Sequence, residues 1–110
     1  MNIRKRRSDR SHIIYQLTNI VTQEIYIGVT VAVGKAYHKS VKDRLRRHIV
    51  RATNETKTWN LCESIRTYGG ESFTWDIVDR IRGKASAHSR ETELIHSLRP
   101  ALNSTVNYCQ

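Results

Sequence analysis

The 110-residue sequence has few of the residues that define several large protein classes. Its two cysteines, Cys62 and Cys109, form neither a disulfide framework nor, on their own, a four-ligand zinc site. No apolar run reaches the length of a membrane span, and the N-terminus has no apolar signal core. We therefore expect one cytoplasmic domain without a membrane segment, large enough to bury about two thirds of its unfolded surface.

Acidic residues are also scarce, since 10 Asp and Glu face 19 Lys and Arg and leave a net charge of +9. The excess is concentrated in residues 1–11 and 35–51, and the rest of the chain is close to neutral. Such concentration favours a polyanion partner, above all nucleic acid, over the alternative of a merely solvated surface. The residues expected to contact the nucleic acid are Arg4, Lys5, Arg6, Arg7, Lys35, Lys39, Lys42, Arg46, Arg47 and Arg51.

The spacing of apolar residues predicts a small α+β domain of order β-β-α-α-β-α, with a three-stranded antiparallel sheet flanked by helices. We expect a basic disordered arm over 1–11, the domain over 12–105 and a tail over 106–110. A loop over 31–39 is expected because Gly34 interrupts any regular pattern. The predicted strands are 12–19, 24–30 and 71–81, and the predicted helices are 41–53, 59–68 and 86–98, with Ser40, Thr58 and Ser86 as N-caps.

The first two strands each carry a tyrosine. Alternation places Tyr26 and Gly28 on the face opposite Ile25 and Ile27, so the hairpin is expected to bring Tyr26 close to Tyr15. Tyrosine is common in strands, and a packing role is the simpler explanation of either residue taken alone. A catalytic role requires partners from elsewhere in the chain.

The two longest helices supply such partners. Arg44 and His48 are four residues apart and lie along one flank of the helix 41–53. In the helix 86–98, Glu91 falls on the apolar stripe, where a carboxylate is costly unless it is paired, protonated or bound to metal. The structural alternatives are an ion pair with Arg44 or another base, or simply the polar edge of an amphipathic helix. Together these groups suit hydrolysis of a phosphodiester with one metal ion.

Five short motifs in the same order resemble the GIY-YIG nuclease family from about Ile13 to Asn103. A single Tyr-Ile-Gly is weak, but five motifs with fitting elements between them are specific. The motifs are Ile13-Ile14-Tyr15, Tyr26-Ile27-Gly28, the helix segment from Lys42 to His48, Arg90-Glu91 followed by Leu94-Ile95, and Pro100-Ala101-Leu102-Asn103.

The resemblance implies Mg²⁺-dependent (or Mn²⁺-dependent) cleavage of DNA. It implies that Tyr26 is the general base or holds the water and that Tyr15 supports it. By the same resemblance, Arg44 would stabilise the transition state and His48 would orient water or phosphate. Glu91 would be the sole protein ligand of the metal.

Two further residues carry implied structural roles: Gly28 would allow close backbone approach, and Asn103 would brace the site. The chain departs from the family directly after Gly28, where many members carry a lysine or serine and this sequence has Val29 and Thr30. Any contact made by such a lysine would have to come from Lys35 or Lys39, in a connection that also looks longer than in compact members.

Several alternatives remain open at this point. The charge alone fits a nucleic-acid-binding protein without catalysis, and the motifs also fit a nuclease acting on RNA or on branched DNA. A separate metal site on the last helix, built from His88, Glu91 and His96, is a weaker hypothesis. No protein partner is evident, and a homodimer is compatible with the sequence.

Overall fold

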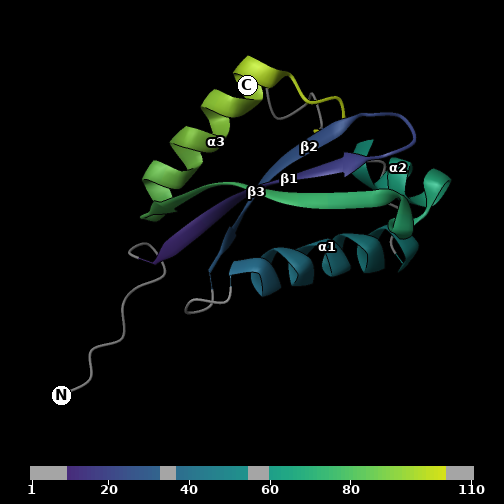
Figure 1. Ribbon diagram of the computed structural model, residues 1–110, viewed down its shortest axis with the longest axis horizontal. Helices are drawn as coiled ribbons and strands as arrows, with labels where there is room; N and C mark the ends of the chain where they lie inside the picture. The colour runs from purple at the N-terminus through teal and green to yellow at the C-terminus, as the bar shows by residue number, and fades with distance from the viewer. Residues whose placement is uncertain (1–9, 33–36, 55–59, 104–110) are drawn as a thin grey trace.

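The computed structural model describes residues 10–32, 37–54 and 60–103 (Figure 1). It confirms the α+β class and the predicted order of strands and helices. The elements are β1 (Ser11–Asn19), β2 (Ile25–Val31), α1 (Tyr37–Asn54), α2 (Asn60–Tyr68), the 3₁₀ turn η2 (Gly70–Ser72), β3 (Phe73–Arg82) and α3 (Lys84–Leu98). None of the helices described here is long and apolar enough to cross a membrane. The predicted arm, tail and Thr58 cap lie outside the described residues.

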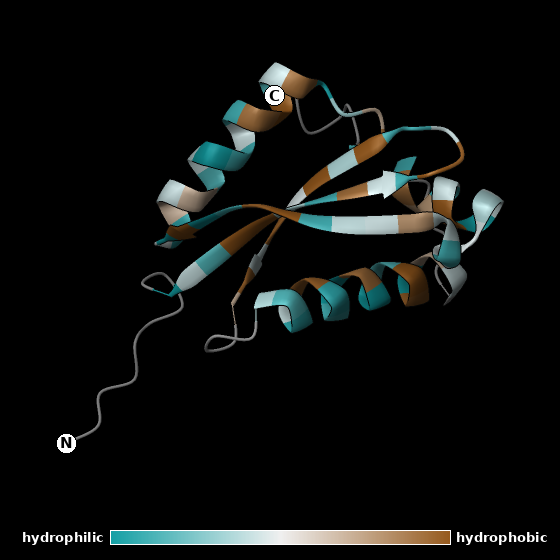
Figure 2. Cartoon of the chain, in the orientation of Figure 1, coloured by the Kyte–Doolittle hydropathy of each residue, from teal (hydrophilic) through white to brown (hydrophobic). Residues whose placement is uncertain are grey.

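The three strands form one antiparallel sheet of order β2-β1-β3, so β1 is the central strand. Its residues Ile13 and Ile14 point to opposite faces, and both are fully buried. Helices α1 and α2 cover one face and α3 covers the other (Figure 1). The main core lies between the sheet and α1 with α2, and the colouring of α1 alternates between apolar and polar residues, as expected for a half-buried helix (Figure 2).

Two predicted helix starts are wrong. Helix α1 begins at Tyr37 rather than Val41, which also corrects the predicted loop over 31–39. Its first turn packs on β3: Arg80 Nη1 donates to the Tyr37 hydroxyl at 2.8 Å, and the rings of His38 and Trp75 lie 5.4 Å apart. These contacts join residues far apart in the sequence, so local patterns do not reveal them.

Helix α3 begins directly after Gly83 rather than at the predicted Ser86 cap. Gly83 has a φ of 96°, a conformation that glycine adopts without steric cost. Its N–H donates to the carbonyl of Arg10 at 3.1 Å, and its carbonyl accepts from Ala87. These hydrogen bonds fix the turn at Gly83 to the start of β1. The predicted start of β3 at Glu71 is also wrong, because the strand begins at Phe73, after the 3₁₀ turn.

The segment after α3 closes the free edge of β2. Leu102 N–H donates to the Ile25 carbonyl at 3.0 Å. The Asn103 side chain accepts from Ile27 N–H and donates to Ile27 C=O, both at 2.9 Å, as a neighbouring strand would. This closure fixes the part of β2 that carries Tyr26 and Gly28.

Candidate active site

A cleft of about 520 Å³ lies between α1, β2 and α3. Tyr26 of β2, Arg44 of α1 and Glu91 of α3 all line it. The structure thus brings together three residues that are up to 65 positions apart in the sequence and that were expected to share one site.

Tyr15 and His48 lie beneath this cleft and do not line it. Their side chains are buried, with 1% and 3% exposure, and Tyr15 Oη lies 3.1 Å from His48 Nε2. The Tyr26 ring packs against both, with centroid distances of 6.2 Å to Tyr15 and 5.4 Å to His48. The expected pair of phenols is therefore present, and the imidazole joins it.

Gly28 makes this arrangement possible. It is the β2 partner of Tyr15, and a Cβ at this position would lie 2.5 Å from Cζ and Oη of the Tyr15 ring. No side chain fits at that distance. The group that closely approaches the backbone of Gly28 is thus the Tyr15 ring.

Arg44 extends its guanidinium into the cleft from α1. Its Nε is buried and has no hydrogen-bond partner among the described residues. An unpaired buried donor is costly, because it has lost its contact with water and gained nothing in return. Arg44 lines the cleft, where a guanidinium is suited to bind an anionic group.

Glu91 forms no ion pair with Arg44 among the described residues, but it does contact another base, as the structural alternative for this carboxylate allowed. Its carboxylate instead lies 3.5 Å from His88 Nδ1, and its side chain is 19% exposed. Burial raises the pKa of Glu91, and the neighbouring His88 lowers it in part. Glu93, on the opposite side of α3, forms an exposed ion pair with Arg90, as the helical spacing predicts.

The ring groups of the site are held in neutral forms. Burial, with Tyr26 and Glu91 nearby, raises the pKa of Tyr15, and burial with Glu91 raises the pKa of Tyr26. Burial and the charges of Arg44 and Arg51 lower the pKa of His48 to about 4. At neutral pH the site therefore offers two phenols and a neutral imidazole beside a guanidinium and a carboxylate.

The basic residues divide into two groups. Arg47 lines the cleft with Arg10 and Lys84, two cations that the sequence analysis did not include. Only their positions in the sequence could have indicated them. Arg10 precedes β1 and Lys84 follows β3, and the antiparallel pairing of these strands brings the two residues to the same end of the sheet. Away from the cleft lining lie Lys39, Lys42, Arg46 and Arg51, whereas Arg4, Lys5, Arg6, Arg7 and Lys35 are outside the described residues.

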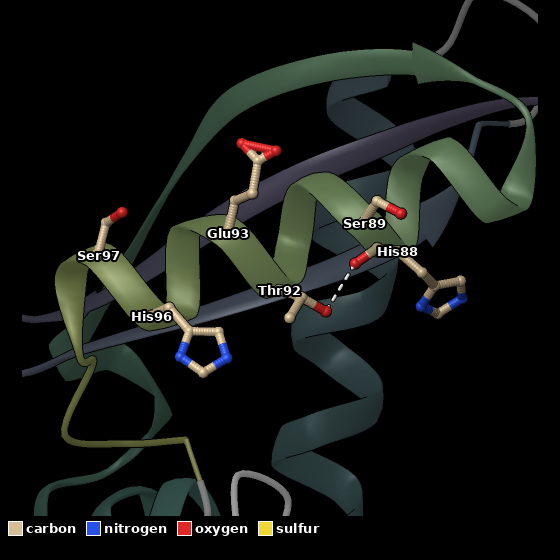
Figure 3. Close-up of a pocket in the computed structure, with 6 residues that line it drawn as sticks. All are labelled: His88, Ser89, Thr92, Glu93, His96 and Ser97. Atoms are coloured by element: carbon tan, nitrogen blue, oxygen red, sulfur yellow. Dashed lines mark hydrogen bonds between the residues drawn. The ribbon is translucent and has the colours of Figure 1, made fainter.

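The separate helix metal site is not supported. Within 10–32, 37–54 and 60–103, no three His, Cys, Asp or Glu side chains are grouped so that they could hold a metal ion. His96 belongs instead to an open pocket on the outer side of α3, where it lies on the same side of the helix as Thr92 and His88 (Figure 3).

No protein-family model matches the chain, and comparison with curated proteins gives no significant match. Solved structures do match, and they show that the chain has the fold of a GIY-YIG catalytic domain. One is a glutamate-to-alanine mutant of the catalytic domain of intron endonuclease I-TevI, with 22% identity, a TM-score of 0.65, and coverage of 86% of this chain and 90% of that one. The catalytic domain of homing endonuclease I-TevI gives 22% identity, a TM-score of 0.64, and coverage of 84% and 94%.

Proposed function

We propose that this protein is a metal-dependent endonuclease that hydrolyses DNA phosphodiester bonds. The observation that carries the proposal is the cleft in which Tyr26, Arg44 and Glu91 meet from three different elements. The fold supports it, because the structures that it resembles are catalytic domains of endonucleases. A carboxylate in a phosphate-binding cleft repels its ligand unless a cation lies between them, which a simple binding protein does not need.

The donor set fits a hard divalent cation. Glu91 is one partly exposed carboxylate in an open cleft, and Mg²⁺ commonly binds through one or two carboxylates while it keeps waters and binds substrate phosphate. Held by Glu91, Mg²⁺ or Mn²⁺ would act as a Lewis acid on the phosphate.

Side chains of the protein supply the remaining catalytic and positioning roles. The guanidinium of Arg44 binds a non-bridging oxygen of the phosphate and stabilises the charge that develops there. Tyr26, a neutral phenol that lines the cleft, holds the attacking water; burial, and after it the charge of Glu91, raises its pKa, so the phenol keeps its proton. Tyr15 and His48 act through Tyr26 by fixing the position of its ring.

The deciding experiment incubates supercoiled plasmid with the protein, with and without Mg²⁺. We expect nicked or linear product only with the metal, and loss of at least about 100-fold in rate for Glu91→Gln with DNA binding retained. Glu93→Gln is the matched control, since it removes the same charge from the opposite side of α3. Full activity of Glu91→Gln would refute the role of Glu91.

The same assay separates the rival functions. Binding without cleavage by the wild type would identify a non-catalytic nucleic-acid-binding protein, to which the charge alone also points. Parallel reactions on RNA and on branched DNA would show whether either is preferred to duplex DNA.

A further inference from the structure

The cleft continues beyond Tyr26, Arg44 and Glu91 toward the start of β1. Arg10 and Lys84 line this far end. Their backbones are held together, because Gly83 N–H and His12 Nδ1 both donate to the Arg10 carbonyl, at 3.1 and 2.8 Å. His12 is itself buried in the sheet. The two cations are therefore carried by a fixed backbone turn.

The two ends of the cleft are separated by a distance that α3 sets. Lys84 and Glu91 are seven residues apart on one helix, which corresponds to about 10 Å at 1.5 Å per residue. A nucleic-acid strand rises by about 3.4 Å per nucleotide along its axis. A strand with its cleaved bond at Glu91 thus has a phosphate two or three nucleotides away at the level of Lys84.

Charge at the far end suits such a phosphate. Neither Arg10 nor Lys84 forms an ion pair with a described residue. Two acids also line the cleft. Asp43 is on α1, and Glu91 is about two turns along α3 from Lys84. Arg10 and Lys84 are exposed, but two unpaired cations that line one cleft together attract a phosphodiester more strongly than isolated cations on a convex surface.

We propose that Arg10 and Lys84 form a subsite for a non-scissile phosphate, two or three nucleotides from the cleaved bond. They supply positive charge to a cleft whose β2 side, at Val29 and Thr30, has none. Lys39, one of the two substitutes first considered, is exposed and does not line the cleft. The position of the phosphate rests on the proposed function, but the affinity of the subsite for DNA does not.

The first test measures duplex DNA binding in a chelator, so that no cleavage occurs. We expect the double variant Arg10→Gln, Lys84→Gln to lower the slope of log affinity against log salt by about 0.9, because that is the change expected for the loss of one phosphate contact. An unchanged slope would overturn the subsite. This result is independent of whether the protein cleaves DNA.

The second test uses duplexes with a mapped cleavage position and one neutral methylphosphonate at each position in turn. In the wild type, neutralising the phosphate two or three nucleotides from the cut should reduce single-turnover cleavage about 10-fold. The double variant should already be reduced by a similar factor and should not respond further. The matched control is Lys42→Gln, Arg46→Gln, two exposed residues of α1 that do not line the cleft. Because both are also expected to contact DNA, all variants are compared at saturating protein, where this control should keep the response.

Equal sensitivity of the wild type and the Arg10, Lys84 variant to that methylphosphonate would refute the assignment. If the wild type cleaves no duplex at all, the proposed function fails, and the salt slope alone decides whether the two cations bind DNA. Thermal unfolding of both double variants checks that each folds as the wild type does.

Discussion

At the scale of single residues, the site depends on Gly28, which has no side chain. Gly28 lies opposite Tyr15 in the sheet, and the space above its Cα is filled by the Tyr15 phenol. The phenol in turn reaches His48 and supports the Tyr26 ring. The motif residues of the hairpin are therefore linked by packing before any substrate is present.

We predict that Gly28→Ala destabilises the fold by about 1–3 kcal/mol, since the new Cβ forces the Tyr15 ring or the strand to move. Urea unfolding measures the loss. The double variant Gly28→Ala, Tyr15→Ala should lose less than the sum of its two single variants, because the clash is then removed. Additive losses would show that the Tyr15 ring is not the cause.

His48 predicts a pH dependence of stability. Its pKa is about 4 in the folded protein and about 6.5 in an unfolded chain, so the unfolded state binds more protons between these values. The neutral imidazole thus contributes stability that is fully present above pH 6.5 and is lost as the pH falls toward 4, with a total on the order of 3 kcal/mol.

Urea unfolding of the wild type and of His48→Gln between pH 7 and 4.5 tests this. The raised pKa of Glu91 acts in the opposite direction, so the informative quantity is the difference between the two proteins at each pH. That difference should shrink as the medium becomes more acidic. A constant difference would contradict the low pKa of the imidazole.

At the scale of elements, periodicity was enough to predict the order of strands and helices but not where each begins. The apolar stripe of Val41, Leu45, Ile49 and Ala52 identified α1; Ile49 is partly buried and the other three are buried. Its first turn was missed, because Tyr37 is stabilised by Arg80 of β3 rather than by its neighbours. The strand order was likewise not predicted, since pairing depends on contacts that no local window contains.

The closure of β2 by Asn103 is the element contact with the clearest energetic consequence. Asn103→Ala leaves the N–H and C=O of buried Ile27 without partners, and we expect a loss of about 2–3 kcal/mol. Asn60→Ala is the control, because Asn60 makes exposed contacts to the same segment and should cost under about 1 kcal/mol. Thermal or urea unfolding measures both, and equal losses would contradict the closure.

At the scale of the whole molecule, the sequence indicated Tyr26, Arg44 and Glu91 for different reasons. Alternation indicated the tyrosine, and helical spacing placed the carboxylate on a buried stripe. Their chemistry suggested one shared site and the resemblance supported it, but neither periodicity nor charge says which elements are neighbours. Arg10 and Lys84 were missed for the same reason: their proximity results from the pairing of β1 with β3.

The basic segment at the N-terminus gives a prediction that depends on charge alone. Replacing Arg4, Lys5, Arg6 and Arg7 by Gln removes four of the 19 Lys and Arg residues. If these residues bind phosphates, the salt dependence of DNA affinity should weaken by up to about 3.5 in slope. An unchanged slope would show that the segment makes no contact with DNA.

The closure of β2 by Asn103 also has a consequence for the order of assembly during synthesis. Tyr15, Tyr26 and Arg44 leave the ribosome early, but Glu91 and the residue that secures Ile27 are made many positions later. At about 5–20 residues per second, the chain spends several seconds without its carboxylate or its β2 closure. On the proposed function, a nascent chain can bind DNA through its early basic residues but cannot cleave it before Glu91 has been made.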